Sequence, residues 1–198
     1  AGLKKPKTPK VEFIKKLPHN SFILDNGCGN GRNMLYPNYQ FQGVDSSQTF
    51  VDMCIEKGLN CELGDMCSLP FKDNTFDAVL SIAAFHHLAT PERRMKALQE
   101  MLRVLKPGSE SLILEFSKPK NPLLKMLHLI YLRTVVPFLG GLLSGQWKSY
   151  VYLDKTIETF LYGEDFCLKM KEVGFQDVQY YPLSWGIVGI YRAKKALR

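Results

Sequence analysis

Three aspartates, Asp25, Asp45 and Asp65, stand at the ends of successive apolar runs. If these runs are neighbouring parallel strands, their carboxyl ends meet at one edge of the sheet, where folds of this kind bind ligands. A carboxylate at that edge attracts a cation and accepts hydrogen bonds from hydroxyl and amino groups. The pattern therefore predicts a site for a ligand that carries both positive charge and hydroxyl groups.

The first aspartate precedes a loop in which glycines alternate with other residues, namely Gly27, Cys28, Gly29 and Gly31. Such glycines, between a strand and a helix, let the backbone approach a ligand closely. A carboxylate beside this turn would repel a pyrophosphate, and arginine replaces the third glycine of the dinucleotide fingerprint. S-adenosylmethionine presents an ammonium and a sulfonium instead, and Asp25 would attract both. We therefore predict S-adenosylmethionine as the cofactor.

The other strand ends complete the predicted cofactor site. Asp45 would accept from both ribose hydroxyls, and Asp65 would accept from the adenine amino group while Met66 packs on the adenine ring. Any one of these aspartates could be an ordinary turn or cap residue, but their joint placement favours a binding site. The remaining residues predicted to bind the cofactor are Ser46, Gly64, Ser81 and Ile82.

A pair of histidines follows the fourth apolar run, where a second substrate would lie. His86 or His87 could act as a general base or donate a hydrogen bond to that substrate, and Arg93 could bind its phosphate or carboxylate. These three residues are the predicted catalytic group. The alternatives are structural histidines and a surface arginine.

The elements that position these residues alternate between strands and helices. Apolar runs predict strands at residues 22–24, 41–44, 61–63, 76–82 and 111–116, and the helix after Asp45 is predicted to present Phe50, Met53 and Cys54. Thr90 followed by proline and glutamate predicts the start of another helix. The order is typical of an α/β, Rossmann-like fold, with a mostly parallel twisted sheet and helices on both faces.

The carboxyl-terminal part departs from this alternation. Residues 119–161 predict a helical cap inserted after the fifth strand, and residues 162–198 predict a closing helix and an antiparallel pair of strands. We expect a single domain over residues 1–198, with a basic segment at 1–20 and a cofactor-binding core at 22–116.

The formal net charge of +7 is unevenly distributed. Residues 1–20 hold six lysines and one glutamate, residues 21–114 hold eight basic and eleven acidic residues, and residues 115–198 hold twelve basic and seven acidic residues. Basic ends of this kind suit nucleic acid or an anionic membrane surface, and they also occur as plain solvated surface.

The five cysteines are odd in number and form no C-x-x-C pair. Neither a disulfide framework nor a metal site is therefore expected, and a reducing compartment fits best. No apolar leader opens the sequence, so we expect a cytoplasmic protein. The apolar stretch at residues 123–143 is interrupted by Lys125, His128, Arg133 and Pro137, which favours a cap or an interfacial segment over a membrane span.

Taken together, these motifs resemble the class I S-adenosylmethionine-dependent methyltransferases. The resemblance covers residues 22–116 and rests on the glycine loop, the three aspartates, Leu69-Pro70-Phe71, Asn74-x-Phe76-Asp77 and Leu105-Lys106-Pro107-Gly108. It implies the class I methyltransferase fold and methyl transfer from S-adenosylmethionine, with no metal of its own.

Two subfamilies are resembled in different halves of the chain. The amino-terminal half, above all the run from Ser81 to Arg94, is similar to the tRNA wobble-uridine carboxymethyl methyltransferases, which esterify a 5-carboxymethyluridine and generally work with a small zinc-binding activator subunit. From Leu114 onward, including Ser149 to Leu153 and Gly186 to Lys194, the chain is similar to the ubiquinone and menaquinone C-methyltransferases, which act on a prenylated hydroquinone at membranes.

The specific histidine–arginine run and the basic ends favour tRNA as the acceptor. A prenylated hydroquinone is the main alternative. A non-catalytic, cofactor-binding partner subunit is a third possibility, because Asn26 and Ser109 depart from the usual pattern.

Overall fold

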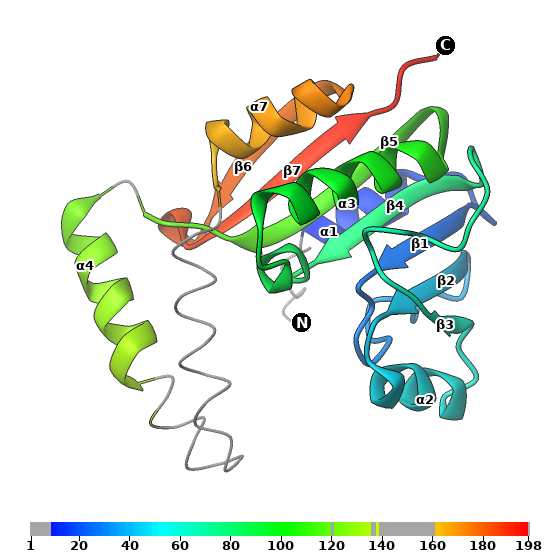
Figure 1. Cartoon of the computed structure of the whole chain (residues 1–198), viewed down its shortest axis with the longest axis horizontal. Helices are drawn as coiled ribbons and strands as arrows, with labels where there is room; N and C mark the ends of the chain where they lie inside the picture. The colour runs from blue at the N-terminus through cyan, green and yellow to red at the C-terminus, as the bar shows by residue number, and fades with distance from the viewer. Residues whose placement is uncertain (1–8, 120, 136–137, 139–160, 198) are drawn as a thin grey trace, which may run out of the picture.

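The computed structural model describes residues 9–119, 121–135, 138 and 161–197 (Figure 1). Its centre is a seven-stranded sheet in the order β3-β2-β1-β4-β5-β7-β6. The strands are β1 (Phe22–Asn26), β2 (Gln40–Asp45), β3 (Cys61–Leu63), β4 (Phe76–Ile82), β5 (Leu105–Phe116), β6 (Gln176–Leu183) and β7 (Val188–Lys194). Strands β1 to β5 pair in parallel, while β7 pairs antiparallel with both β5 and β6. The predicted fold class and closing antiparallel pair are confirmed.

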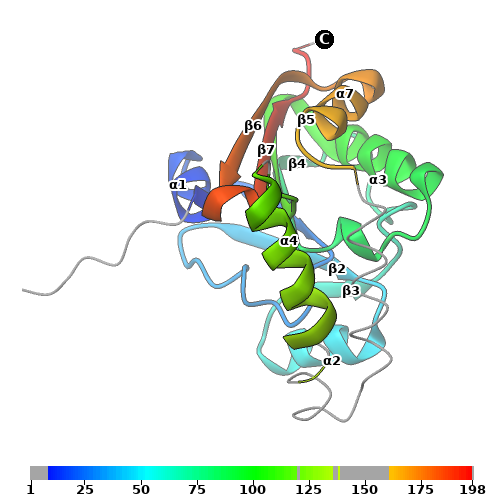
Figure 2. The ribbon, with the colours of Figure 1, turned by 90° about the vertical axis from the view of Figure 1, so that its left-hand side faces the viewer.

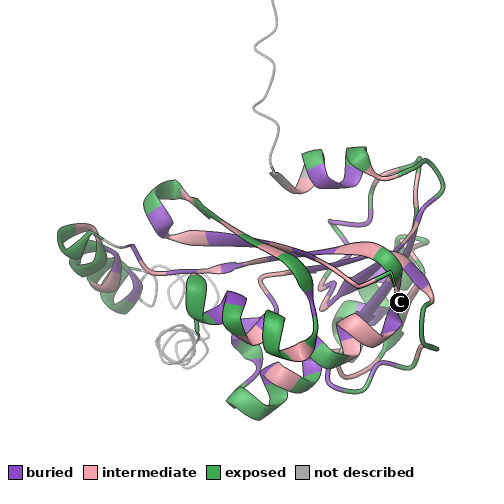
Figure 3. Ribbon diagram, turned by 90° about the horizontal axis from the view of Figure 1, so that it is seen from above, coloured by how far each residue is buried: buried purple, intermediate pink, exposed green. Residues whose placement is uncertain are grey.

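The described helices cover both faces of the sheet. They are α1 (Pro9–Lys16), α2 (Gln48–Glu56), α3 (Pro91–Val104), α4 (Pro122–Ile130) and α7 (Glu164–Val173), with short turns η1 (Phe85–His87), η2 (Tyr131–Val135) and η3 (Ser184–Gly186). Helix α1 lies on one face, and α3 and α7 lie on the other (Figures 1 and 3). Helix α4 projects beyond the edge toward which β1 and β4 point (Figures 1 and 2).

Two apolar cores follow from the alternation of side chains along the strands. On β1, Leu24 packs into the core under α3 and α7, while its neighbour Ile23 packs into the core that α1 covers. Both side chains are completely buried. A strand covered on both faces must be apolar at consecutive positions, which is why these strands read as unbroken runs.

Helix α3 begins and ends where its sequence predicts. The Thr90 hydroxyl accepts a hydrogen bond from the Arg93 amide at 3.3 Å, and Pro91 and Glu92 occupy the first turn. Leu98 and Met101 on the predicted apolar face are fully buried. This cap fixes the end of α3 that carries Arg93.

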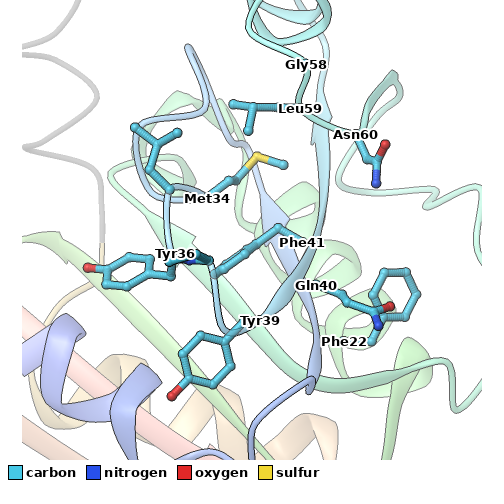
Figure 4. A pocket seen from close by; sticks show the side chains of 11 residues that line it. Phe22, Met34, Tyr36, Tyr39, Gln40, Phe41, Gly58, Leu59 and Asn60 are labelled. Carbon is cyan, nitrogen blue, oxygen red and sulfur yellow. The ribbon is translucent and has the colours of Figure 1, made fainter.

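No helix follows the glycine loop, although loops of this kind commonly join a strand to a helix. Residues 27–39 form turns and irregular chain between β1 and β2. Few residues separate Gly31 from Pro37, which removes a backbone donor and leaves no room for several helical turns. Side chains of the loop, among them Met34 and Tyr36, cover this part of the sheet instead, and they border a surface hollow of about 670 Å³ (Figure 4).

One helix was not predicted, and one expectation about α2 needs correction. Lys15 and its neighbours in the basic amino-terminal segment belong to α1, for which no helix was predicted. On α2 the inward residues are Val51 and Cys54, whereas Phe50 and Met53 are about two-fifths exposed. A helix that covers the end of a sheet buries a narrow stripe, so apolar residues beside that stripe remain accessible.

The predicted cap at residues 119–161 lies largely outside the described residues. Its first part forms α4 and the π-helical turn η2. Asn121 caps α4 by accepting from the Leu123 and Leu124 amides. In the described part of the chain, no helix has the length and apolar character needed to cross a bilayer.

Candidate functional site

A cavity of about 720 Å³ opens at the carboxyl ends of β1, β2 and β4. Its wall comes from the glycine loop, the end of β2, the turn after β3, and the segment from the end of β4 to the start of α3. The sequence-predicted residues that line it are Gly27, Cys28, Gly29, Asp45, Ser46, Gly64, Asp65, Met66, Ile82, His87 and Arg93. Four separate segments of the sequence therefore meet around one hollow.

Four predicted residues do not line this cavity. Asp25 is completely buried behind the glycine loop. Gly31 faces away from the cavity, because a Cβ atom there would lie 2.4 Å from a Leu59 methyl carbon. The Ser81 hydroxyl donates to the Asn26 carbonyl at 3.0 Å, and His86 is buried beside Glu115.

The glycine loop is held close to its neighbours. Gly27 has φ +77°, and a Cβ atom there would lie only 2.5 Å from the Cβ of Ala84. Both facts require glycine, because no other residue tolerates this backbone conformation together with so close a contact. The loop can therefore pass directly over the end of β4.

Asp45 ties the loop to the second strand. Its Oδ2 accepts from the Gly29 amide at 2.8 Å, and its Oδ1 accepts from the Ser47 amide at 2.9 Å. Each carboxylate oxygen has two acceptor positions, so Asp45 keeps acceptor capacity toward the cavity. This arrangement suits a ligand that presents a pair of hydroxyl groups.

Asp25 is a completely buried carboxyl. Neither oxygen has a hydrogen-bond partner among the described residues. Burial raises the pKa of Asp25 to about 7, and the nearby Asn33 amide and Lys10 ammonium oppose that rise only in part. Such a group is poised to ionise when a cation arrives.

Asp65 is paired with the predicted catalytic arginine. One terminal nitrogen of Arg93 contacts both Asp65 oxygens, at 2.9 and 3.0 Å, and the Cys67 amide donates to Oδ1 at 2.9 Å. Partial burial would raise the pKa of Asp65, but the Cys67 amide and Arg93 together hold it below its ordinary value. Asp65 thus faces the cavity as an anion that Arg93 keeps in place.

The two predicted histidines have different surroundings. His86 Nδ1 lies 2.9 Å from Glu115 Oε2, and both side chains are buried. His87 lines the cavity, and its ring centroid lies 4.0 Å from that of His86. Partial desolvation and the neighbouring His86 ring lower the pKa of His87. His87 is therefore a neutral proton acceptor at pH 7, held against a buried His86–Glu115 pair.

Sequence reasoning missed Glu115 and Phe50. Glu115 accepts from the Phe85 amide at 2.6 Å as well as contacting His86, so it fixes the turn that presents His87. An acid inside the apolar run at residues 112–116 was the available signal. Phe50 lines the cavity from α2, and it had been assigned to the apolar face of that helix.

Solved structures share this fold at low sequence identity. A S-adenosylmethionine-dependent methyltransferase from Methanosarcina mazei aligns with TM-score 0.66 and 21% identity, covering 94% of this chain and 98% of that chain. A chain in the complex of the Haloferax volcanii Trm112 methyltransferase activator with a methyltransferase aligns with TM-score 0.65 and 15% identity, covering 93% and 88%.

Curated relatives divide between two activities. UbiE of Geobacter sulfurreducens, a ubiquinone/menaquinone biosynthesis C-methyltransferase, is 35% identical over 190 residues, covering 89% of this chain and 73% of the relative. The mitochondrial 2-methoxy-6-polyprenyl-1,4-benzoquinol methylase of Bos taurus is 43% identical over 138 residues, covering 70% and 41%. The tRNA (carboxymethyluridine(34)-5-O)-methyltransferase of Arabidopsis thaliana is 45% identical over 109 residues, covering 54% and 27%. The chain thus spans less than half the length of the last two.

The match to a family model extends from the second strand to the last. The ubiE/COQ5 methyltransferase family model matches residues 45–195, which include the Asp45 end of β2, the histidine pair and the antiparallel strands. The resemblance to class I methyltransferases is therefore confirmed, and the chain belongs to the ubiE/COQ5 methyltransferase family.

Proposed function

We propose that this chain transfers a methyl group from S-adenosylmethionine to a prenylated hydroquinone. The use of S-adenosylmethionine as the methyl donor rests on one observation: the glycine loop, Asp45 and Asp65 meet around one cavity of about 720 Å³. Behind that loop lies the carboxyl of Asp25, whose oxygens have no hydrogen-bond partner among the described residues. Carboxylates with spare hydrogen-bond acceptor positions suit a ligand that is cationic and rich in hydroxyl groups.

The residues present fit this cofactor. Asp45 would accept from the ribose hydroxyls, and Asp65 from the adenine amino group, with Met66 packing on the ring. Gly29 leaves open space, since a Cβ atom there would meet nothing within 4 Å. Asp25 lies beneath the loop, on the side of the positive end of the ligand. When Asp25 ionises there, the positive charge of the ligand balances the buried negative charge of the carboxylate.

When bound, S-adenosylmethionine supplies an electrophilic methyl group on a sulfonium. His87 then prepares the acceptor, because a neutral imidazole in the cavity wall can take the phenolic proton and make the ring carbon more nucleophilic. Glu115 and His86 keep the turn that carries His87 in place. Leu88 and Ala84, which also line the cavity, limit access of water on this side.

A prenylated acceptor is supported by the family and by helix α4. The family model runs through the carboxyl-terminal half, in which a specific acceptor would be recognised. Leu123, Leu127 and Ile130 on α4 are each exposed by half or more. An exposed apolar helix beyond the carboxyl ends of the strands suits a lipid tail or a membrane surface.

The test is methyl transfer by the full chain with labelled cofactor and a short-tailed prenylated hydroquinone in detergent, with total tRNA assayed in parallel. We expect labelled quinol, and His87→Ala should lower its rate by about 100-fold or more, the lower range for a lost general base. His19→Ala, which changes an exposed histidine away from the cavity, is the matched control. Equal activity of the His87 and His19 variants would remove the base assignment.

A tRNA acceptor is the second candidate. The 45% identity to the Arabidopsis thaliana tRNA enzyme over 109 residues supports it, together with the lysines near the amino terminus. If tRNA alone is labelled, the acceptor half of the proposal is wrong. Dependence of that labelling on a small zinc-binding activator would follow the partnership in the Haloferax volcanii complex. Cofactor binding without transfer to either substrate would favour the non-catalytic subunit.

A further inference from the structure

Three cysteines that are far apart in the sequence meet beneath the glycine loop. Cys28 follows β1, Cys54 lies on α2, and Cys61 begins β3. Their sulfur atoms all lie within 4.8 Å of one another, and Cys28 Sγ lies 3.4 Å from Cys61 Sγ. All three thiols are free.

The thioether of Met34 joins this cluster over Gly43. A Cβ atom built on Gly43 would lie 2.9 Å from Cys28 Sγ, 3.0 Å from Met34 Sδ and 3.2 Å from Cys61 Sγ. The three sulfurs therefore surround the place that a side chain on β2 would fill. Cys54 Sγ and Met34 Sδ likewise both lie near Gly31.

We propose that Cys28, Cys54 and Cys61, together with Met34, form a binding site for a soft metal ion, and that Cu(I) is the ion that fits this donor set. Two thiolates on one ion, with metal–sulfur bonds of about 2.3 Å, lie at most ~4.6 Å apart. The observed separations need only a small contraction to meet that limit. Each thiol that binds gives up its proton to solvent as its sulfur–metal bond forms.

The choice of ion follows from the donors and their surroundings. Thiolate and thioether sulfur are soft ligands that select Cu(I), whereas a thioether contributes little to zinc sites. Phe41 and Leu59 pack around the cluster, so its environment is apolar. A monovalent ion that needs few ligands and no water is suited to such a place.

The ion has a route to the site from the surface. Cys61 is partly exposed, and Met34 and Leu59 line the hollow beside the loop (Figure 4). Figure 4 shows the Met34 side chain extending toward Leu59 along this hollow. A soft ion can therefore reach the thioether first and then the thiols behind it.

Occupation of this site would act on the cofactor cavity, and this part rests on the proposed function. Cys28 lies between the two glycines of the loop and lines the cavity. The Cys54 thiol donates to the Gly29 carbonyl at 3.3 Å, a contact that a metal-bound thiolate cannot keep as a donor. We expect copper to weaken cofactor binding, and the cofactor must then weaken copper binding by the same factor.

The primary test titrates the reduced full chain with Cu(I), without oxygen and against a chromophoric Cu(I) chelator, and counts metal by native mass spectrometry. We expect one copper per chain. Cys54→Ser and Cys61→Ser should each lower the affinity for Cu(I) by more than about 100-fold. This exceeds the loss that is usual for residues that do not bind the metal directly. Met34→Leu should lower it by about 10-fold.

Cys167→Ser is the matched control, because Cys167 is also buried but lies on α7, away from the cluster. Circular dichroism of each variant checks that it folds. Wild-type affinity in both Cys54→Ser and Cys61→Ser would overturn the site, as would binding of Zn(II) with no binding of Cu(I). If two of the thiols form a disulfide in air and the reduced chain binds no copper, the cysteines are a redox pair and the metal site is wrong.

Calorimetry with S-adenosylhomocysteine tests the coupling separately. The copper-loaded chain should bind this ligand at least ~10-fold more weakly than the metal-free chain, a coupling within the usual range. Equal affinities would overturn the coupling but leave the metal site. If the metal-free chain does not bind the ligand at all, the proposed function fails while the copper stoichiometry still decides the site.

Discussion

Asp25 combines complete burial with two carboxylate oxygens that lack a hydrogen-bond partner among the described residues. Its pKa of about 7 lies above the ordinary value of 3.8. Between about pH 4 and pH 7, the folded chain therefore keeps a proton on Asp25 that the unfolded chain has already released. Stability must fall as pH rises through that window, because the folded state binds more protons there. The buried Asp25 carboxyl thus lowers the stability of the ligand-free protein, and it becomes favourable only when a cation binds.

Replacing this carboxyl tests the argument. Asp25→Asn should make stability independent of this titration, and at pH 8 the variant should exceed wild type by up to ~4 kcal/mol, at about 1.4 kcal/mol per pKa unit. Urea unfolding at pH 5, 6 and 8 measures the difference. The same substitution should abolish cofactor binding. Asp52→Asn, at an exposed position on α2, is the control, and parallel pH curves for Asp25→Asn and wild type would contradict the prediction.

At the scale of elements, α3 and α4 have different tasks. Helix α3 packs its Leu98 and Met101 face into the core and carries Arg93 to the cavity, where it holds Asp65. Helix α4 presents apolar side chains outward and makes few contacts with the sheet. We therefore expect α3 to be required for the proposed cofactor site, and α4 to be available to an acceptor or a membrane.

The cap of α3 gives one prediction. Thr90→Ala removes the hydroxyl that accepts from the Arg93 amide and should lower the free energy of unfolding by ~1 kcal/mol. Thr90→Ser keeps an acceptor at this position and should retain most of the stability. Denaturant titration measures both. A loss as large in the serine variant as in the alanine variant would show that the hydroxyl is not the stabilising group.

A further prediction concerns the exposed apolar face of α4. Replacing Leu123 and Leu127 together by glutamine should weaken binding to phospholipid vesicles that contain the quinol and raise KM for that acceptor, while cofactor affinity stays unchanged. The removed apolar surface is the physical reason. Leu168→Gln, at an equally exposed leucine on α7, is the control. Unaltered vesicle binding in the double variant would assign α4 another partner.

The whole molecule is not uniformly basic. An acidic middle segment contributes Asp25, Asp45 and Asp65 to the proposed cofactor site, and two basic segments flank it. No described residue of the two basic segments lines the cavity, so their excess positive charge is available for an anionic surface.

Ionic strength distinguishes the two acceptors at this scale. Methylation of a quinol in uncharged detergent should change little between low and moderate salt, because apolar burial is not screened. Binding to tRNA would fall steeply with salt, since counterions are released from the phosphates. Initial rates and filter binding over a salt series make the comparison. A steep loss of quinol methylation with salt would contradict the expectation that apolar burial dominates binding of this acceptor.

The sequence by itself determined most of the succession of strands and helices along the chain and most of the residues of the cavity wall. Apolar runs, the capped start at Thr90 and the strand-end aspartates are local signals, and local signals survive into the fold because each strand and cap is specified by adjacent residues. The irregular chain after the glycine loop could not be read from the glycine spacing, because that spacing does not report how few residues remain before Pro37.

Only the tertiary structure decided which side chains meet. It turned His86 toward Glu115 and left His87 in the cavity wall, a distinction that two adjacent histidines do not reveal in sequence. It also gathered Cys28, Cys54 and Cys61, whose spacing along the chain had indicated no metal site. Contacts between distant segments depend on strand order and helix packing, so a burial-raised pKa or a cluster of sulfurs exists only once the chain has folded.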